Sequence, residues 1–504
     1  MDLFQRRQTV KEVPFLNRFA GFTDLGFMYE AHKGFRTQVL TEMHKRHRIV
    51  RIGPNSLSVT GVDAIKDIYG HGTPCSKDLF YEVTSGTHKH LADVVDKSSH
   101  ARKRKVMSAA YAIKNLEEWE FKVADKTLRF LKACDKACTT PLTPGMKEPD
   151  PADLTFDYRK WTNLFTVEAI ADIGLSEKLG FLDAGSDRIT AERLDGTTYE
   201  VNFCETLHST ALAQVCLVWS YPWFRFNEYL ARILSRRLRW LLDRGHSWND
   251  IIYHRTRKRL SRYHNGEKLD DFFQALMEDK AGNPNNAEFG EIFAEVSIMM
   301  NAGSDTTAIA MTNALYNLLA NPPTLNKLRQ EVDSALDESY SNEHNDIEHC
   351  VAQYSKVKHL PYLRAVLDES LRLFPPVTFN LPRRTPPGGC FVGSEFIPGD
   401  TSVSVSSWTA HRDESVFPEP EKFIPERWLG ESSTELQKGF IPFSTGARGC
   451  IGRNISYLEQ TVLLASIVHR YEMALPSPTW KPERTEGTNL LIKNMPIKVW
   501  RRKV

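Results

Sequence analysis

The chain has 504 residues, of which 41% are hydrophobic and 25% are charged, and its formal net charge at pH 7 is +2. This composition is that of an ordinary globular protein, and the near-balance of charge excludes bulk binding of nucleic acid. No run of about 18 apolar residues occurs, which excludes a membrane-spanning helix within this sequence, and charges interrupt residues 1–22 too often for a signal peptide.

Hydrophobic periodicity and the positions of Pro and Gly predict a mostly α protein with minor β structure. No linker is long enough to separate independent domains, so residues 1–504 are predicted to form a single domain. The predicted elements, in chain order, are a helical region at 35–135 that includes a strand pair near 49–61, a proline-rich loop at 139–152, a helical region at 157–280, a helix at 287–321, a polar loop at 338–350, a helix at 361–373 and strands within 390–408.

The longest predicted helix, at 287–321, is closed by two prolines. At 1.5 Å per residue it would be about 50 Å long, the width of a whole domain. Its middle reads AGSDTT, residues 302–307, where small and polar residues interrupt an apolar stretch. A polar stripe facing solvent would also give this pattern, but the Ile and Met residues on both sides indicate a buried helix. A buried acid and hydroxyl, Asp305 and Thr306, are candidates for proton delivery beside a metal.

The helix predicted at 361–373 contains ESLR, in which Glu369 and Arg372 lie three residues apart and therefore share one face. On a surface such a pair would matter little. The leucines around it indicate a buried helix, where an unpaired charge would be costly. Arg427, within FIPERW, is predicted to complete a buried ionic network with the pair.

Residues 443–452 read FSTGARGCIG, which surrounds Cys450 with three glycines and precedes an apolar helical run. A thiolate is a strong ligand for soft metals, and glycines let the backbone approach a flat ligand closely. The start of the following helix directs free N–H groups at the sulfur. Arg448 can meet a ligand carboxylate, and Phe443 can keep water from the sulfur. This set predicts a thiolate that ligates a porphyrin iron; the alternative is a glycine-rich surface turn with an inert cysteine.

Together these motifs resemble the cytochrome P450 family of heme-thiolate monooxygenases. FSTGARGCIG matches the family signature F-x-x-G-x-R-x-C-x-G, ESLR matches its E-x-x-R motif, and FIPERW and AGSDTT match its P-E-R and oxygen-activation elements. The resemblance extends from about residue 13 to 502. It implies the cytochrome P450 fold, mostly α with minor β, with the long central helix over the heme.

The resemblance also implies roles for single residues. Cys450 would be the axial ligand of the iron in heme b. Asp305 and Thr306 would be the catalytic acid and alcohol that deliver protons during oxygen activation. The structural network on the proximal side would consist of Glu369, Arg372 and Arg427. The remaining residues implied to bind the cofactor are His100, Arg104, Arg383, Arg448, Phe443, Gly446, Gly452, Ala302 and Gly303.

Two details of this implied site stay open. Arg383 and Arg384 are alternatives for one of the contacts to the heme propionates. The basic run Arg102–Lys105 would lie on the proximal face, where it would bind an acidic, separate NADPH–cytochrome P450 reductase; the alternative is a solvated helix face. Within the run, Lys103 and Lys105 are the residues expected to bind the reductase.

The stretches VRIGPNSLSV, HARKRK and LPRRTPPGG are similar to a fungal microsomal group that includes benzoate 4-hydroxylases and secondary-metabolite oxidases. Such enzymes carry an N-terminal membrane helix, which is absent from this sequence. The implied location is therefore the cytosolic face of the endoplasmic reticulum membrane, in a peripheral or truncated form, or the cytoplasm if no anchor exists. The apolar stretch at 215–224 would be either a loop that contacts the membrane or an aromatic core segment.

The implied function is monooxygenation of a hydrophobic small molecule with O2 and electrons from the reductase, in fungal secondary metabolism. The alternatives are a benzoate-type aromatic acid hydroxylase and a heme-thiolate peroxygenase or isomerase that needs no external electrons. The resemblance implies a mostly apolar pocket, whose walls would come from residues 78–95, 205–216, 298–306 and 377–381 and from a hairpin near Leu490 and Leu491.

Overall fold

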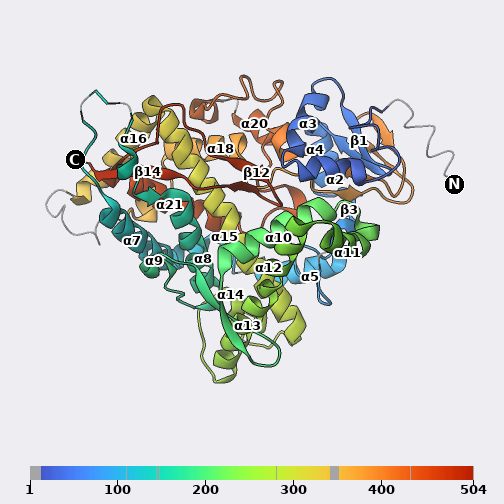
Figure 1. Cartoon of the computed structure of the whole chain (residues 1–504), viewed down its shortest axis with the longest axis horizontal. Coiled ribbons are helices and arrows are strands. Elements are labelled where there is room, and N and C mark those ends of the chain that lie inside the picture. Colours follow the sequence, from blue (N-terminus) through green and yellow to red (C-terminus); the bar gives the residue numbers. More distant parts are fainter. Residues whose placement is uncertain are drawn as a thin grey trace.

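The computed structural model describes residues 13–502 apart from 84, 109, 144, 147, 280, 341–350 and 432. Helices dominate, as predicted, and small sheets lie among them (Figure 1). Most of the loop predicted at 338–350 lies outside the described residues, while its first residues belong to α16 (Pro322–Tyr340). Within the described part, no helix combines the length and apolar character needed to cross a bilayer.

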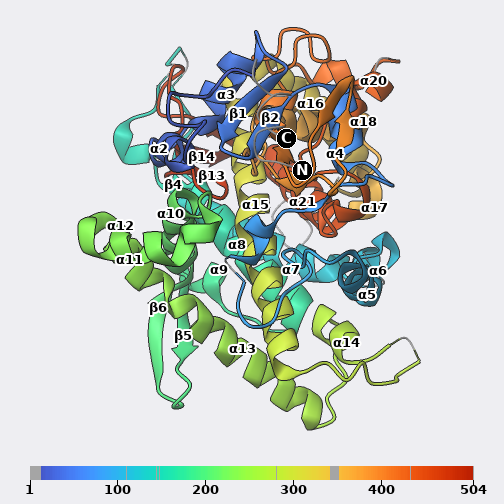
Figure 2. The same cartoon turned by 90° about the vertical axis from the view of Figure 1, so that its right-hand side faces the viewer.

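The central element is α15 (Phe289–Ala320), a 32-residue helix that runs through the middle of the molecule (Figure 2). It agrees with the prediction for 287–321. The prolines that follow it open α16 directly, because the first turn of a helix does not use the N–H that proline lacks. The helix α8 (Tyr158–Leu175) packs along α15 and is itself almost wholly buried.

Two further helices hold the site from the other side. The predicted helix at 361–373 is α18 (Pro361–Leu373), and the apolar run after Cys450 forms α21 (Arg453–Arg470). Both pack against α15. The other helices are α2 (Leu25–His32), α3 (Arg36–His44), α4 (Val62–Tyr69), α5 (Lys97–Ser108), α6 (Ile113–Glu118), α7 (Glu120–Ala137), α9 (Phe181–Ala184), α10 (Phe203–Leu217), α11 (Phe224–Leu234), α12 (Arg236–Gly245), α13 (Ser247–His264), α14 (Phe272–Met277), α17 (Tyr354–Val357), α19 (Ser407–Ala410) and α20 (Ser433–Gly439).

The largest sheet has the strand order β1-β2-β10-β7-β3 and brings distant parts of the chain together. Its strands are β1 (Ile49–Gly53), β2 (Ser56–Val59), β3 (Ser76–Lys77), β7 (Arg383–Arg384) and β10 (Ser402–Ser404). The pair β2 and β10 is parallel, and the other pairs are antiparallel. In the register of β3 and β7, Lys77 lies opposite Arg383, and both side chains reach the cavity described below.

The remaining strands form smaller units. They are the sheet of β4 (Phe156–Asp157), β14 (Pro496–Arg501) and β11 (Tyr471–Ala474), and the two-stranded pairs β5 (Arg188–Glu192) with β6 (Thr198–Asn202), β8 (Cys390–Val392) with β9 (Glu395–Ile397), and β12 (Arg484–Glu486) with β13 (Leu490–Ile492).

The pair β5 and β6 contradicts the prediction of continuous helix at 157–280. The segment alternates β-branched and polar residues on both sides of an Asp-Gly turn, and Gly196 in that turn has φ +86°. This pattern is typical of a hairpin, because the turn needs the left-handed backbone that glycine adopts without strain. The helix α13 packs on β5, which buries one face of the hairpin.

Candidate functional site

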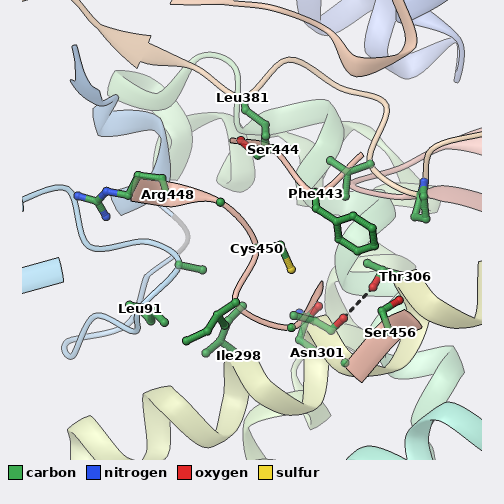
Figure 3. Close-up of a pocket in the computed structure, with 18 of the residues that line it drawn as sticks. Leu91, Ile298, Asn301, Thr306, Leu381, Phe443, Ser444, Arg448, Cys450 and Ser456 are labelled. Atoms are coloured by element: carbon green, nitrogen blue, oxygen red, sulfur yellow. Dashed lines mark hydrogen bonds between the residues drawn. The ribbon is translucent and has the colours of Figure 1, made fainter. Parts of the chain in front are cut away.

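A cavity of about 510 Å³ lies between α15 and the loop that carries Cys450. Figure 3 shows Cys450 at its centre, with Ile298, Asn301 and Thr306 projecting from α15 on one side. Its volume falls within the range of cofactor and ligand sites. Most of the lining surface is apolar, and the charged side chains on it include both bases and acids.

The loop before α21 presents the Cys450 sulfur to the cavity (Figure 3). The Cys450 N–H donates to the Phe443 carbonyl at 2.8 Å, which closes the loop. The thiol is exposed to the cavity, where its position deep in the protein raises its pKa by desolvation, while the backbone N–H groups of Gly452 and Arg453 and the guanidinium of Arg104 lower it. The site therefore offers the thiolate hydrogen bonds from the helix start, as predicted for a metal ligand.

Three loop residues implied to contact the cofactor differ in their positions. Phe443 lines the cavity and packs on Tyr457 with ring centroids 5.2 Å apart. Gly452 also lines it. Gly446 does not line the cavity: it has φ +68°, and a Cβ there would lie 2.0 Å from the Tyr69 carbonyl oxygen. Gly446 is therefore needed for the tight turn against α4, and the structure does not place it in contact with a ligand.

A rim of basic side chains borders one edge of the cavity. Arg104 donates to the Gly449 carbonyl at 2.7 Å, Arg383 to the Tyr81 hydroxyl at 3.2 Å, and Arg448 to the Val94 carbonyl at 2.6 Å. His100, only 6% exposed, lies beside them, and burial together with Arg448 and Arg104 lowers its pKa to about 4. All four line the cavity, so they are in position for the cofactor contacts that the resemblance implied.

The neighbouring Arg384 is the alternative that the structure does not support. It binds Asp78 at 3.1 Å and the Tyr221 hydroxyl, and it does not line the cavity. Because successive side chains of a strand point to opposite faces, only one of the two arginines of β7 can reach the cavity, and it is Arg383.

Lys77 is a rim residue that sequence reasoning missed. It is 9% exposed, lines the cavity, bonds to the Ala92 carbonyl, and lies 3.9 Å from the Tyr81 ring centroid. Burial, Arg383 and Arg448 lower its pKa well below the ordinary value. Only its pairing opposite Arg383, more than 300 residues away in sequence, reveals its position, so no local signal could have found it.

The rim carries an excess of positive charge. Among the described residues, none of Lys77, Arg104, Arg383 and Arg448 has a carboxylate within ion-pair distance. Like charges gathered at a buried edge are costly unless an anion neutralises them. A flat ligand with two carboxylates, such as a porphyrin with its propionates, fits both this rim and the thiol at the cavity centre.

On α15, Ala302, Gly303 and Thr306 line the cavity. The Thr306 hydroxyl donates to the Ala302 carbonyl at 2.9 Å, one turn earlier in the helix. A Cβ on Gly303 would lie 2.5 Å from Cγ1 of Ile170, so this glycine lets α8 approach α15 closely. Packing against α8 therefore explains Gly303 without reference to any ligand above Cys450.

Asp305, the acid next to Thr306 on α15, does not itself line the cavity. Arg159 of α8 donates to its Oδ1 at 2.5 Å, and His208 of α10 lies 2.9 Å from the same oxygen. Asn489 donates to Oδ2 at 3.0 Å. Although burial alone would raise the pKa of Asp305, His208 and Arg159 lower it well below the usual range. The carboxylate is thus held ionised by its partners, away from the cavity.

The same contacts explain why two predicted walls are wrong. Among the described residues, none from 205–216 and neither Leu490 nor Leu491 lines the cavity. Both elements instead reach Asp305, through His208 and Asn489, on a side of α15 that is turned away from the cavity. The other predicted walls, at 78–95, 298–306 and 377–381, do contribute lining residues.

The predicted ionic network lies beneath the site. Glu369 and Arg372, both fully buried, form a bidentate pair with distances of 2.8 and 2.9 Å. Arg427 donates to Glu369 at 3.1 Å, and the Trp428 indole adds a bond at 2.9 Å. Arg372 also donates to backbone carbonyls of the segment before Arg427. The network therefore ties α18 to the segment at 420–428.

The basic run on α5 is not a free surface patch. Lys103 is 8% exposed and pairs with Glu291 at 2.6 Å and Glu295 at 2.9 Å, both on α15. Arg102 also binds Glu291, at 2.7 Å. Lys103 therefore ties α5 to α15 and is unavailable to a partner, which contradicts its predicted role. Lys105 is exposed.

Glu459 is a second residue that was missed. It lies on α21, is 2% exposed and lines the cavity, and its Oε2 has no partner among the described residues. Burial raises its pKa well above the ordinary value. A sequence signal was present here, because Glu459 is a lone acid within the apolar run ISYLEQTVLLASIV.

Comparison with known proteins agrees with this geometry. The family model described as Cytochrome P450 matches residues 25–500. Benzoate 4-monooxygenase bphA of Aspergillus niger is 29% identical over 94% of this chain and 89% of its own length. Trichothecene C-15 hydroxylase of Fusarium sporotrichioides is 30% identical over 87% of this chain and 84% of its own length. Tryprostatin B 6-hydroxylase of Neosartorya fischeri is 26% identical over 94% of this chain and 79% of its own length.

Proposed function

This chain belongs to the cytochrome P450 family, and on that premise we propose that it hydroxylates an uncharged, apolar small molecule held between α15 and the loop at 77–93. It is a heme-thiolate monooxygenase by family. The observation that carries the proposal is the division of the cavity: the basic side chains gather at one rim, and the rest of the wall is mostly apolar.

The cofactor we propose is heme b. Cys450 would ligate its iron, and Arg104, Arg383, Arg448, His100 and Lys77 would bind its propionates. When bound, the heme supplies the iron at which dioxygen is reduced with external electrons. The residues of the chain hold the group, keep water from the sulfur through Phe443, and present a hydroxyl, that of Thr306, to the cavity.

An uncharged substrate is favoured over a benzoate-type acid by the charges on the wall. A carboxylate deep in the cavity would need a cation away from the rim. The basic side chains that line the cavity lower one another's pKa values because they lie close together at one rim, which leaves the rest of the wall without a cation for a substrate carboxylate. Two acids on the described wall, Asp93 and Glu295, add negative charge that disfavours a substrate carboxylate beside them.

The test uses holoprotein purified with heme. We expect the reduced carbon-monoxide complex to show the long-wavelength absorbance band of a thiolate-ligated heme, and Cys450→Ser to lose it. Binding spectra should then be compared for benzoate and for uncharged aromatic and terpenoid compounds. Spectral shifts with the uncharged compounds alone support the proposal, while a shift with benzoate at lower concentration contradicts it. Coupling of NADPH oxidation to product, with added reductase, separates monooxygenation from peroxygenase or isomerase activity.

We propose that the electrons come from an NADPH–cytochrome P450 reductase, which docks beside the Cys450 loop. Lys105 follows Arg104, the residue that bonds to Gly449 in that loop, and Arg453 begins α21. Both Lys105 and Arg453 are exposed. Exposed cations near the sulfur suit an acidic partner, because electrostatic complementarity raises the encounter rate.

A membrane surface is the second partner we propose. Within the stretch at 215–224, the first residues pack in the core, and Trp219 contacts the rings of Phe27 and Phe80. An exposed apolar face begins at the end of the stretch with Trp223, which precedes α11, and continues along α11 with Phe226, Tyr229, Ile233 and Leu234. Their spacing of three and four residues places most of them on one side of the helix. Such a face suits peripheral attachment to the cytosolic side of the endoplasmic reticulum.

A further inference from the structure

The face of α15 that lines the cavity carries one amide side chain, that of Asn301. Asn301 lies between the apolar lining residues Ile298 and Ala302 and projects from α15 toward the cavity (Figure 3). Its backbone carbonyl accepts a hydrogen bond from the Ser304 hydroxyl at 3.1 Å, but no described residue bonds to its side-chain amide. The residue is half-buried, and no other described lining residue carries an amide side chain. Two N–H donors and one carbonyl acceptor are therefore available to a ligand.

The acids of the wall are less accessible to an uncharged ligand than Asn301 is. Glu295 pairs with Lys103 at 2.9 Å. Asp93 and Glu459 each have one carboxyl oxygen without a described partner, but these oxygen atoms are themselves buried, so a ligand in the cavity does not reach them. The amide of Asn301 is not among these buried, unpaired groups. It is therefore a polar group of the wall that a substrate can contact.

Asn301 lies at the edge of the cavity face of α15 that is turned away from α21. Thr307, near the other edge, donates to Ser456 of α21, the helix that follows Cys450. Asn301 lies one turn before Asp305, so the two share a side of α15, and the partners of Asp305 come from α8, α10 and the β12–β13 turn. The packing of α15 on α21 therefore does not account for an amide at this position.

Resting on the proposed monooxygenase function, we propose that Asn301 is a specificity-determining residue, which donates a hydrogen bond to a carbonyl or ether oxygen of an otherwise apolar, uncharged substrate. On the same face of α15, Thr306 uses its hydrogen for the Ala302 carbonyl and Thr307 uses its own for Ser456. The Asn301 amide is thus the donor that this face keeps for a substrate. An analogue without the oxygen leaves the amide unpaired, so the cavity selects molecules that carry it.

The test compares 1-tetralone with tetralin, two uncharged bicyclic compounds that differ by one carbonyl group. Their dissociation constants are measured from the spectral shift of the heme in purified holoprotein. Each variant is then described by the ratio of the two constants. This ratio cancels effects that are common to both ligands, such as a change in the size of the cavity.

Asn301→Leu replaces the amide with an apolar group of similar size, while Asn301→Asp keeps the size and removes the N–H donors. Each should weaken the binding of 1-tetralone relative to tetralin about fivefold. The matched control is Ile298→Ala, which changes an apolar lining residue of the same helix. It should affect both ligands alike and leave the ratio unchanged. The reduced carbon-monoxide complex should keep its long-wavelength band in all three variants, which shows that the heme site is intact.

Infrared difference spectra of 1-tetralone with an isotope label at its carbonyl carbon give a second readout, which does not depend on affinity. The carbonyl band of the bound ligand should lie at lower wavenumber in the unmodified protein and in Ile298→Ala than in Asn301→Leu, because accepting a hydrogen bond weakens the C=O stretch. An unchanged affinity ratio together with an unchanged band in Asn301→Leu overturns the proposal, although the proposed function then stands. Absence of the carbon-monoxide band from the unmodified protein would instead refute the proposed function.

Discussion

Gly303 allows a direct test of why α15 has a glycine at the centre of the site. A Cβ there would lie 2.5 Å from Cγ1 and 2.8 Å from Cδ1 of Ile170. Overpacking of this kind costs about 1–3 kcal/mol, while Ala in place of Gly within a helix returns about 1 kcal/mol. The single variant Gly303→Ala should therefore be destabilised by no more than about 2 kcal/mol. Because the overpacking cost and the gain in helix propensity oppose each other, the stability of Gly303→Ala alone is a weak test. The informative quantity is the free energy of coupling between Gly303→Ala and a substitution at Ile170.

Ile170→Ala alone should cost about 2–5 kcal/mol, because it leaves a cavity between α8 and α15. In the double variant the new methyl group fills part of that cavity and meets no clash. Its loss of stability should be smaller than the sum of the single losses by about 1–3 kcal/mol. The measurement is urea-induced unfolding of the four holoproteins. Additivity within about 0.5 kcal/mol would refute the packing explanation.

A control separates packing from ligand space. Ala302 is exposed to the cavity, so Ala302→Val adds volume there rather than against α8. We expect Ala302→Val to weaken ligand binding and to show no energetic coupling with Ile170. Gly303→Ala should leave the carbon-monoxide spectrum unchanged, because its Cβ points at Ile170.

The other predictions concern the proton path, the rim, the redox partner and the membrane. Thr306→Ala should retain heme and NADPH oxidation but release more hydrogen peroxide for each NADPH oxidised. Asp305→Asn should chiefly lower the unfolding temperature, because it leaves buried Arg159 without its ionised partner. Lys77→Gln should weaken heme retention without changing the position of the carbon-monoxide band. Heme loss would be measured as the rate at which heme transfers to apomyoglobin. Lys105→Glu should raise the reductase concentration for half-maximal rate, and the effect should shrink with added salt; an unchanged value places the docking surface elsewhere. Phe226→Glu should reduce flotation with anionic phospholipid vesicles several-fold and leave heme binding unchanged; equal flotation would exclude the α11 face.

The local sequence predicted the elements that carry strong periodicity or punctuation. The long helix, the helix at 361–373 and the helix after Cys450 agree with the structure closely, because apolar spacing and the flanking Pro or Gly residues act within a few turns. The hairpin of β5 and β6 lies within the region predicted to be helical, although its Asp-Gly turn is a recognisable hairpin signal in the sequence. The hairpin is short and lies between helices, so the helical periodicity on both sides of it dominates the prediction for the whole region.

The sequence by itself determined the chemistry of the centre: a cysteine in a glycine-rich turn, arginines near it, and a hydroxyl within an apolar helix. Which side chains face the cavity was decided only by tertiary structure. Strand pairing brings Lys77 opposite Arg383, and contacts from α8, α10 and the β12–β13 turn hold Asp305 away from the cavity. These relations join residues more than 90 positions apart. The helical period specifies which residues share a face, but the elements packed against that face decide what it meets.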